Sequence, residues 1–259
     1  MGKVDLNFKP SVPVFDANVA LGRRHDQVVN KDTLEQLFEE MGRAGVNRSL
    51  VWHPHGVAYD SIEGNLILME LIHGDSRLVP QFLCNPSFDD FDALTRSIKD
   101  AAVRSIRMVP QYQHYPFREW VVGPWLDWME REGIALWLPS TYTVFGNTTE
   151  LNPSDVYDTI KEHSRLNVVL SEIHYSNVSW AVPLLKSLPN IHVETSRLTI
   201  ADPINRFLEF MDEERILFGS RYPDSAMGIN VYALHHMGLS ESTVRAICSG
   251  NLERLLGMA

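Results

Sequence analysis

The regular alternation of short apolar runs with longer amphipathic segments constrains the fold of this chain more than any other feature. Eight apolar runs are predicted as strands: Val12–Asp16, Val46–Trp52, Leu78–Cys84, Ser105–Val109, Ile134–Leu138, Val168–Ile173, Ile191–Thr195 and Ile216–Gly219. Segments with helical spacing follow them: Lys31–Gly45, Ser61–Ile72, Phe88–Ala101, Trp125–Glu132, Asn152–His163, Ala181–Leu188, Ile204–Met211, Val231–Met237 and Ser242–Leu256. This pattern is typical of parallel strands buried on both faces.

Chain length selects among the folds that use parallel strands. The chain has 259 residues, close to the roughly 250 residues of an eight-stranded barrel. No GxGxxG or GxxxxGK[ST] follows a predicted strand, which argues against a nucleotide-binding open sheet. No internal repeat or low-complexity linker divides the chain. We therefore predict an α/β fold, a (β/α)₈ TIM barrel that forms a single domain over residues 1–259.

Charge and cysteine content limit the partners and the compartment. The net charge of −10 repels a phosphate backbone, and no cluster of Lys and Arg offsets it, so nucleic acid is not an expected partner. Cys84 and Cys248 lie far apart and form no CxxC pattern, which fits a reducing cytoplasm. Met1–Pro10 shows no signal-peptide pattern, and no run of about 18 apolar residues predicts a membrane span. We expect a cytoplasmic globular protein.

Polar residues gather where the predicted strands end. In TIM barrels the active site forms at the C-terminal ends of the strands, from strand tips and the loops that follow. The polar residues expected there are Asp16, Asn18, His53, His55, Arg107, His114, Glu172, His174, Arg221 and Asp224. A single histidine at a strand end is more often structural than functional. Several charged and imidazole groups at one mouth favour a ligand site.

Several segments, taken in their order along the chain, match one known family pattern. They are residues 14–22 at the first strand, 45–49 entering the second, 189–196 at the seventh, 215–223 at the eighth, and 250–257 near the C-terminus. On these segments the chain resembles the amidohydrolase-related branch of the metal-dependent hydrolase superfamily, which includes decarboxylase relatives. The resemblance covers almost the whole chain, and it implies a TIM barrel with hydrolase or lyase chemistry.

The resemblance also implies a metal site, and the chain departs from it. The family pattern has His-x-His after strand one, a His ending strand five, a His on strand six and an Asp after strand eight. Those positions fall here on Asn18 and Ala20, on or beside Pro139, on Glu172 and on Arg221. Ala20 and Pro139 offer no side-chain donor, and Arg221 places a permanent cation where the ion belongs. We expect no metal there, and we expect Arg221 to pair with Glu172 and Asp16 instead.

A relocated metal site is the alternative that the sequence leaves open. His53, His55, His174 and Glu172 could together hold a divalent ion such as zinc, because the two residues of a His-x-His pair on one strand share a face. Pro54 between the two histidines indicates that the strand has already ended. We therefore favour the metal-free site, with no cofactor.

Two functions are compatible with these residues. The first is an enzyme acting on a small, carboxylated and hence anionic substrate, with His53, Glu172 or His174 handling protons. Substrate contacts would come from Asp16, Asn18, His55, Arg107, His114, Arg221 and Asp224. The second is a non-catalytic relative, a pseudoenzyme that binds a small ligand or a partner protein. The aromatic stretch Tyr112–Trp120 is predicted to cover the mouth or to form a dimer contact, which leaves a homodimer open.

Overall fold

The computed structural model describes residues 8–26 and 31–258. Part of the N-terminal stretch tested for a signal peptide, residues 1–7, lies outside the described residues. Within them no helix is both long enough and apolar enough to cross a membrane. The strands are β1 (Phe15–Ala20), β2 (Arg48–Trp52), β3 (Leu78–Pro80), β4 (Phe82–Leu83), β5 (Ser105–Arg107), β6 (Ala135–Pro139), β7 (Thr141–Val144), β8 (Asn147–Glu150), β9 (Val168–Ser171), β10 (Ile191–Glu194) and β11 (Ile216–Leu217).

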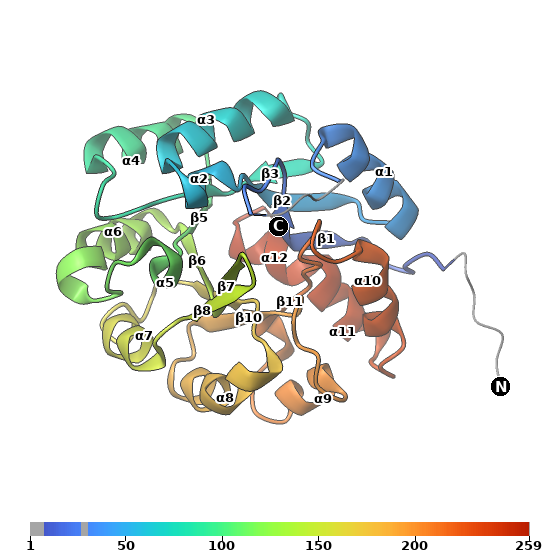
Figure 1. Ribbon diagram of the computed structural model, residues 1–259. Helices are drawn as coiled ribbons and strands as arrows, with labels where there is room; N and C mark the ends of the chain where they lie inside the picture. Colours follow the sequence, from blue (N-terminus) through green and yellow to red (C-terminus); the bar gives the residue numbers. More distant parts are fainter. Residues whose placement is uncertain (1–7, 27–30, 259) are drawn as a thin grey trace.

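Helices surround the ring of strands on all sides (Figure 1). The α-helices are α1 (Leu34–Ala44), α2 (His55–Ala58), α3 (Ser61–Ile72), α4 (Phe91–Asp100), α5 (Pro110–Gln113), α6 (Glu119–Glu132), α7 (Pro153–Ile160), α8 (Val178–Ser187), α9 (Pro203–Leu208), α10 (Met227–His235), α11 (Glu241–Arg245) and α12 (Asn251–Leu255). Short 3₁₀ turns occur at η1 (Tyr175–Asn177) and η2 (Glu213–Arg215), and a π-helical turn at η3 (Ala246–Gly250).

Backbone hydrogen bonds close the strands into a barrel. The strands pair in parallel in the orders β1-β2-β3 and β4-β5-β6-β9-β10-β11. β3 and β4 are two pieces of the predicted third strand, and Gln81 between them donates its N–H to the Val51 carbonyl at 2.8 Å. Between β1 and the segment that contains and follows β11, Ala17 N–H donates to Phe218 O at 2.9 Å and Ala20 N–H donates to Tyr222 O at 2.8 Å. The prediction of an α/β TIM barrel is confirmed.

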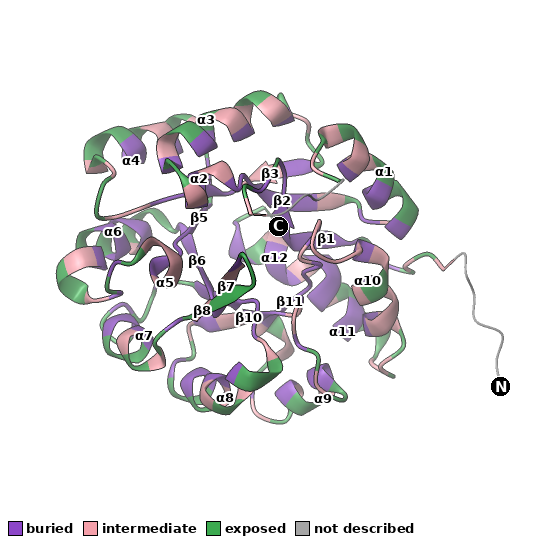
Figure 2. Cartoon of the chain, viewed as in Figure 1, coloured by how far each residue is buried: buried purple, intermediate pink, exposed green. Residues whose placement is uncertain are grey.

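The barrel interior is packed with side chains below the mouth. Phe15, Leu50 and Trp137 form a buried cluster inside the ring, and α12 adds Leu252 and Leu255 to it. Buried residues line the strands and the inward faces of the helices, whereas the outward faces are exposed (Figure 2). Each fully buried side chain of this size contributes about 1.5–3 kcal/mol. The ring of strands is therefore filled by side chains below the mouth.

The outer helices are defined by their caps and apolar faces, and α1 shows how. The Thr33 side chain accepts from the Gln36 N–H, and the Gln36 side chain accepts from the Thr33 N–H. The two residues therefore form a capping box. Gly45 ends the helix with a left-handed φ of 77°, and Leu37 and Met41 are among the residues buried against the barrel. The helix therefore begins at Leu34, three residues after the start of the predicted segment Lys31–Gly45.

The first strand lies further along the chain than predicted. The apolar run Val12–Asp16 indicated an early strand, but β1 spans Phe15–Ala20 and is buried throughout. The polar Asp16 and Asn18 lie within it, where β1 has an irregular register against β2 between Asp16 and Val19. Asn18 therefore faces the mouth from inside the strand instead of from the loop after it.

A hairpin that the sequence analysis did not predict follows strand β6. β7 and β8 pair antiparallel, with Phe145 and Gly146 at the turn, both at positive φ. Such a two-residue turn suits a right-handed hairpin. The hairpin contributes residues to the site described next.

Candidate active site

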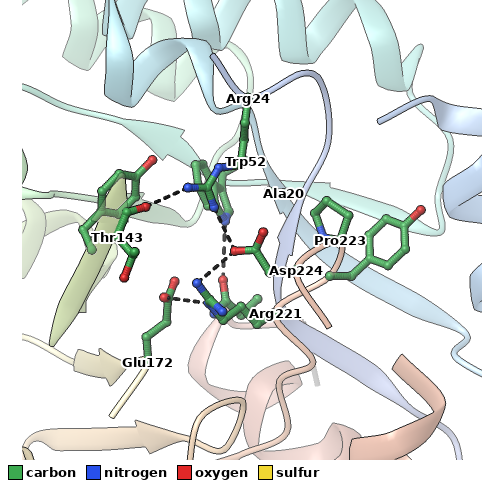
Figure 3. A pocket seen from close by; sticks show the side chains of 11 residues that line it. Ala20, Arg24, Trp52, Thr143, Glu172, Arg221, Pro223 and Asp224 are labelled. Carbon is green, nitrogen blue, oxygen red and sulfur yellow. Dashed lines mark hydrogen bonds and ion pairs between the residues drawn. The ribbon is translucent and has the colours of Figure 1, made fainter. Parts of the chain in front are cut away.

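A small cavity lies at the C-terminal mouth of the barrel (Figure 3). Its volume is about 20 Å³, room for about one water molecule. The lining residues come from β1 and its following loop, from β2, from the hairpin, and from the segments after β9 and β11: Asn18, Ala20, Arg24, Trp52, Tyr142, Thr143, Glu172, Arg221, Tyr222, Pro223 and Asp224. The strand ends thus converge where the sequence predicts a site.

An ion pair between Arg221 and Glu172 crosses this cavity. Arg221 Nε donates to Glu172 Oε2 at 3.0 Å, and both residues are in the left-handed region, with φ of 63° and 55°. That conformation costs roughly 1–2 kcal/mol per residue. Burial disfavours the charge of Arg221, but the nearby charges of Glu172 and Asp224 outweigh it and raise the pKa of Arg221 above its usual range. The predicted pairing of Arg221 with Glu172 is confirmed.

The predicted pairing of Arg221 with Asp16 is wrong. Asp16 Oδ1 accepts from the Asn18 N–H at 3.0 Å and the Ser220 N–H at 2.9 Å, so it joins β1 to the segment after β11. Its Oδ2 is buried without a hydrogen-bond partner among the described residues. Burial raises the pKa of Asp16 to about 7. The carboxyl group is directed to the backbone seam instead of the mouth.

Arg107 lies directly below the cavity and is fully buried. Its Nε donates to Gln81 Oε1 at 2.7 Å and its Nη2 to Asn18 Oδ1 at 2.9 Å. The guanidinium lies 4.7 Å from the centre of the Trp52 ring, and Nη1 lies 3.8 Å from Glu172 Oε1. Burial lowers the pKa of Arg107 to about 10. It remains charged at neutral pH and orients the polar groups of the mouth.

Glu194 at the end of β10 is a buried carboxylate that the predicted site did not include. Its Oε2 accepts from Asn18 Nδ2 and from Ser196 Oγ, each at 3.0 Å, and its Oε1 accepts from the Ser196 N–H. Burial raises the pKa of Glu194. Glu194 lies at a strand end, but nothing in the sequence indicates its contact with Asn18. It fixes the orientation of that amide.

Arg24 is a second residue that sequence reasoning missed. It follows β1 and reaches across the mouth to two other segments: Nη1 donates to Asp224 Oδ2 at 2.8 Å, and Nη2 to the Thr143 carbonyl at 2.8 Å. Nε and Nη2 also bind Asp26 at 2.9 and 2.8 Å. Burial opposes its charge, but Asp26 and Asp224 raise the pKa of Arg24 above its usual range. No strand-end rule points to a loop residue of this kind.

His53 lies beside the mouth and does not line the cavity. Its ring packs against Gly22, and its Nδ1 accepts from the His55 N–H at 3.2 Å. Burial, with a smaller contribution from His55, lowers the pKa of His53 to about 4. The imidazole is therefore neutral at physiological pH.

The other three predicted histidines do not line the cavity. His55 Nε2 lies 2.8 Å from Glu63 Oε2 of α3, and His174 Nδ1 lies 2.9 Å from Ser176 Oγ at the start of η1. His114 is exposed at the end of α5 with a φ of 58°. The structure thus gathers Asn18, Glu172, Arg221 and Asp224 around one cavity, with Asp16 and Arg107 buried close by. It does not bring His55, His114 or His174 to it.

The contact of His53 with Gly22 gives a prediction for folding stability. Gly22 has a φ of 112°, and a Cβ there would overlap the His53 ring. We expect Gly22→Ala to lower the free energy of unfolding by about 2–4 kcal/mol, from backbone strain together with overpacking. Urea unfolding followed by fluorescence measures the change.

A matched control for that variant is Gly74→Ala. Gly74 also has a positive φ, 71°, but a Cβ there meets nothing within 4 Å. Its cost should be the backbone strain alone, about 1–2 kcal/mol. Equal losses for the two variants would contradict the proposed contact with His53.

The described residues do not fit the metal site that the resemblance implies. At those positions Ala20 and Pro139 lack a donor, and Glu172 is already paired with the guanidinium of Arg221. The relocated alternative is not supported either. Within residues 8–26 and 31–258, no three His, Cys, Asp or Glu side chains converge in a way that could hold an ion.

Fold and site together define a TIM-barrel protein with its polar residues collected at the C-terminal mouth. The family model described as amidohydrolase matches residues 14–258. The chain belongs to this amidohydrolase family. No curated protein matches the sequence.

Solved structures show the same fold at low sequence identity. An uncharacterised TIM-barrel protein from Bordetella bronchiseptica is 16% identical, with a TM-score of 0.76 over 97% of this chain and 99% of the other. A 2,6-dihydroxybenzoate decarboxylase from Rhizobium is 13% identical, with a TM-score of 0.73 over 96% and 99%. A 5-carboxyvanillate decarboxylase from Novosphingobium aromaticivorans, complexed with manganese and a nitrobenzoic acid, is 12% identical, with a TM-score of 0.75 over 95% and 96%.

Proposed function

We propose that this protein is an enzyme that acts on a small carboxylated substrate at the mouth of the barrel, as a hydrolase or a decarboxylating lyase, without a divalent metal. The single observation that carries this proposal is the Arg221–Glu172 pair at 3.0 Å. It places a fixed cation and a carboxylate together at the C-terminal strand ends, the face at which TIM-barrel active sites form. Similar structures that are described as decarboxylases of hydroxylated benzoates support the substrate class.

Arg221 is proposed to bind the negative charge of the substrate and of the transition state. Guanidinium groups form short, charge-assisted hydrogen bonds to carboxylates and to developing oxyanions. Arg221 is partly exposed to the cavity, whereas Arg107 below it is fully buried. We therefore assign contact with the substrate to Arg221, and the positioning of Asn18 and Glu172 to Arg107.

Glu172 is proposed to move the proton. It lines the cavity, and its carbonyl accepts from Ser140 Oγ at 2.7 Å, which fixes its backbone. In hydrolysis its carboxylate would take a proton from the attacking water, and in loss of carbon dioxide it would first take a proton from solvent water and then pass it to the remaining carbanion. His53 and His174 stay predictions for this role, and neither lines the cavity.

The proposal also covers the cellular location and the domain organisation of the protein. Cys84 and Cys248 are both buried and unpaired with each other, which supports a cytoplasmic location. We propose that residues 1–259 work as one domain, with the substrate as the main partner.

The test is a turnover screen of small esters, lactones and aromatic carboxylates. Among the substrates turned over, we expect Arg221→Ala and Glu172→Gln to lower kcat/KM by about 100-fold or more, and His174→Ala to change it less than threefold. Circular dichroism would verify that each variant is folded. Elemental analysis of the active protein is expected to find manganese and zinc far below one ion per chain.

Two outcomes would count against the proposal. Binding without turnover across the whole screen would favour the second function, a pseudoenzyme that holds a ligand. One stoichiometric ion whose removal abolishes activity would overturn the metal-free mechanism.

A further inference from the structure

One carboxylate oxygen of the protein lies between two arginines at the mouth. Asp224 Oδ2 accepts from Arg24 Nη1 at 2.8 Å and from Arg221 Nη2 at 2.9 Å. All three side chains are largely buried, with relative exposures of 13%, 9% and 22%. Figure 3 shows the Asp224 carboxylate between the two guanidinium groups. We call Arg24 and Arg221 the arginine clamp.

The arginine clamp and Asp224 separate two spaces. Inside lies the cavity of about 20 Å³, which is too small for any carboxylated organic molecule. Outside lies a cleft of about 330 Å³, lined by the clamp, Asp224 and residues that include Thr143 and Phe145. That volume is in the range of small-ligand sites. A substrate that reaches Glu172 must therefore displace the contact between Asp224 and the clamp.

We propose that Asp224 occupies the seat of the substrate's carboxylate in the free protein, and that Arg24 is a specificity-determining residue of this site. In the bound state, a carboxylate oxygen of the ligand would take the hydrogen bonds that Arg24 and Arg221 now donate to Asp224. The body of the ligand would lie in the outer cleft. This inference rests on the proposed substrate class, and it adds Arg24 and Asp224 as the recognition elements.

Chemical complementarity supports this exchange. A ligand carboxylate and the Asp224 side chain present the same acceptor, so the exchange leaves no buried guanidinium unpaired. Arg24 also remains held by Asp26 and by the Thr143 carbonyl during the exchange. The clamp is therefore preorganised, and only Asp224 needs to move.

When Asp224 occupies the seat, an external ligand cannot bind there. The apparent affinity for the ligand therefore equals the intrinsic affinity multiplied by the fraction of molecules in which the seat is free. Asp224→Asn keeps the size of the side chain and removes its charge. We expect this variant to bind benzoate at least tenfold more tightly than the unchanged protein, by titration calorimetry. Benzamide, which matches benzoate without the charge, should gain less than twofold.

Arginine variants identify the groups responsible. In the Asp224→Asn background, Arg24→Gln should abolish the gain in benzoate affinity. Arg23→Gln is the matched control, because Arg23 is the adjacent arginine and is exposed; it should retain the gain. Inorganic phosphate in a parallel titration distinguishes a seat for carboxylate from a general oxyanion seat.

A second measurement does not depend on the body of the ligand. Asp224→Ala removes a group with the chemistry of acetate, so added acetate should raise the Tm of this variant by several degrees more than it raises that of the unchanged protein. Failure of Asp224→Asn to fold would leave this acetate response as the deciding result.

Several results would overturn the inference: equal or weaker benzoate binding by Asp224→Asn, no benzoate binding by any variant, an equal gain for benzamide, or an equal gain for phosphate. Absence of the acetate response would do the same. Because these assays measure binding, they separate the inference from the proposed function. A tenfold gain without any turnover would sustain the seat and refute catalysis, whereas turnover without the gain would refute only the seat.

Discussion

Replacing Arg107 with leucine is expected to lower the free energy of unfolding by about 3–5 kcal/mol, because it removes one partner from a fully buried polar network. The acceptors on Gln81 and Asn18 would lose their hydrogen bonds in a region without access to solvent. Glu172 would also lose the nearby positive charge. Urea unfolding at neutral pH measures this loss.

Arg104→Leu is the matched control for this variant. Arg104 is exposed and lies just before the same strand, β5. Its replacement should change stability by less than about 0.5 kcal/mol. If Arg107→Leu cost no more than Arg104→Leu, the buried network would not contribute to stability as described.

The stability that Asp16 contributes should fall as the pH rises from about 4 to about 7, whereas the lowered pKa of His53 contributes in the opposite direction over that range. Burial raises the pKa of Asp16 from 3.8 to about 7 in the folded protein. Between these values the folded state binds more protons than the unfolded state, so the free energy of unfolding decreases with increasing pH. The full effect is on the order of 4 kcal/mol. It is present below pH 4 and lost as the pH passes 7.

Asp16→Asn isolates this contribution. The amide oxygen can still accept from the Asn18 and Ser220 N–H groups, and the side chain stays neutral at every pH. Relative to the unchanged protein, the variant should therefore become more stable as the pH rises from 4 to 8, in urea titrations at each pH. A difference in stability that does not vary with pH would disprove the assignment.

The exposed carboxylate of Asp158 provides a control for the direction in which stability changes with pH. Lys161 and Arg118 lower the pKa of Asp158, so its charged form stabilises the folded protein. Asp158→Asn should therefore lose stability as the pH rises, by a small amount because the pair is exposed and screened by solvent.

The barrel itself was predictable because parallel strands buried on both faces are apolar over their whole length. The exceptions are strands whose residues face a polar interior. β1 carries Asp16 and Asn18 inside the ring, so the apolar pattern placed it about three residues too early. Gln81 likewise divides the third strand into β3 and β4, because its side chain binds Arg107 within the barrel.

The missed hairpin did leave a signal in the sequence. Residues 141–144 are rich in Thr, Tyr and Val, and Phe145-Gly146 supplies the turn. Strand propensity on both sides of a turn containing glycine indicates a hairpin. The expectation of one helix after every strand concealed it.

The site was predictable as a location and only partly as a set of contacts. Glu172, Arg221 and Asp224 were found because the ends of parallel strands meet at one edge. Arg24 could not be found this way, since its partner Asp224 lies 200 positions away and neither spacing nor composition links them. His114 and His174 follow strands as well, but His114 is exposed at the end of α5 and His174 binds Ser176, so neither lines the cavity.

The guanidinium at the end of the eighth strand also bears on how such a mouth can evolve. An ion is acquired after synthesis and varies with supply, whereas Arg221 is encoded and present in every copy of the chain. The family pattern that the sequence resembles would require histidines at positions 18, 20 and 172 and at or beside 139, together with an acid at 221. An acid at 221 alone would set a carboxylate beside Glu172 with no cation between them. Positions 221 and 172 are therefore coupled, because an exchange of the arginine alone leaves Glu172 without its cation.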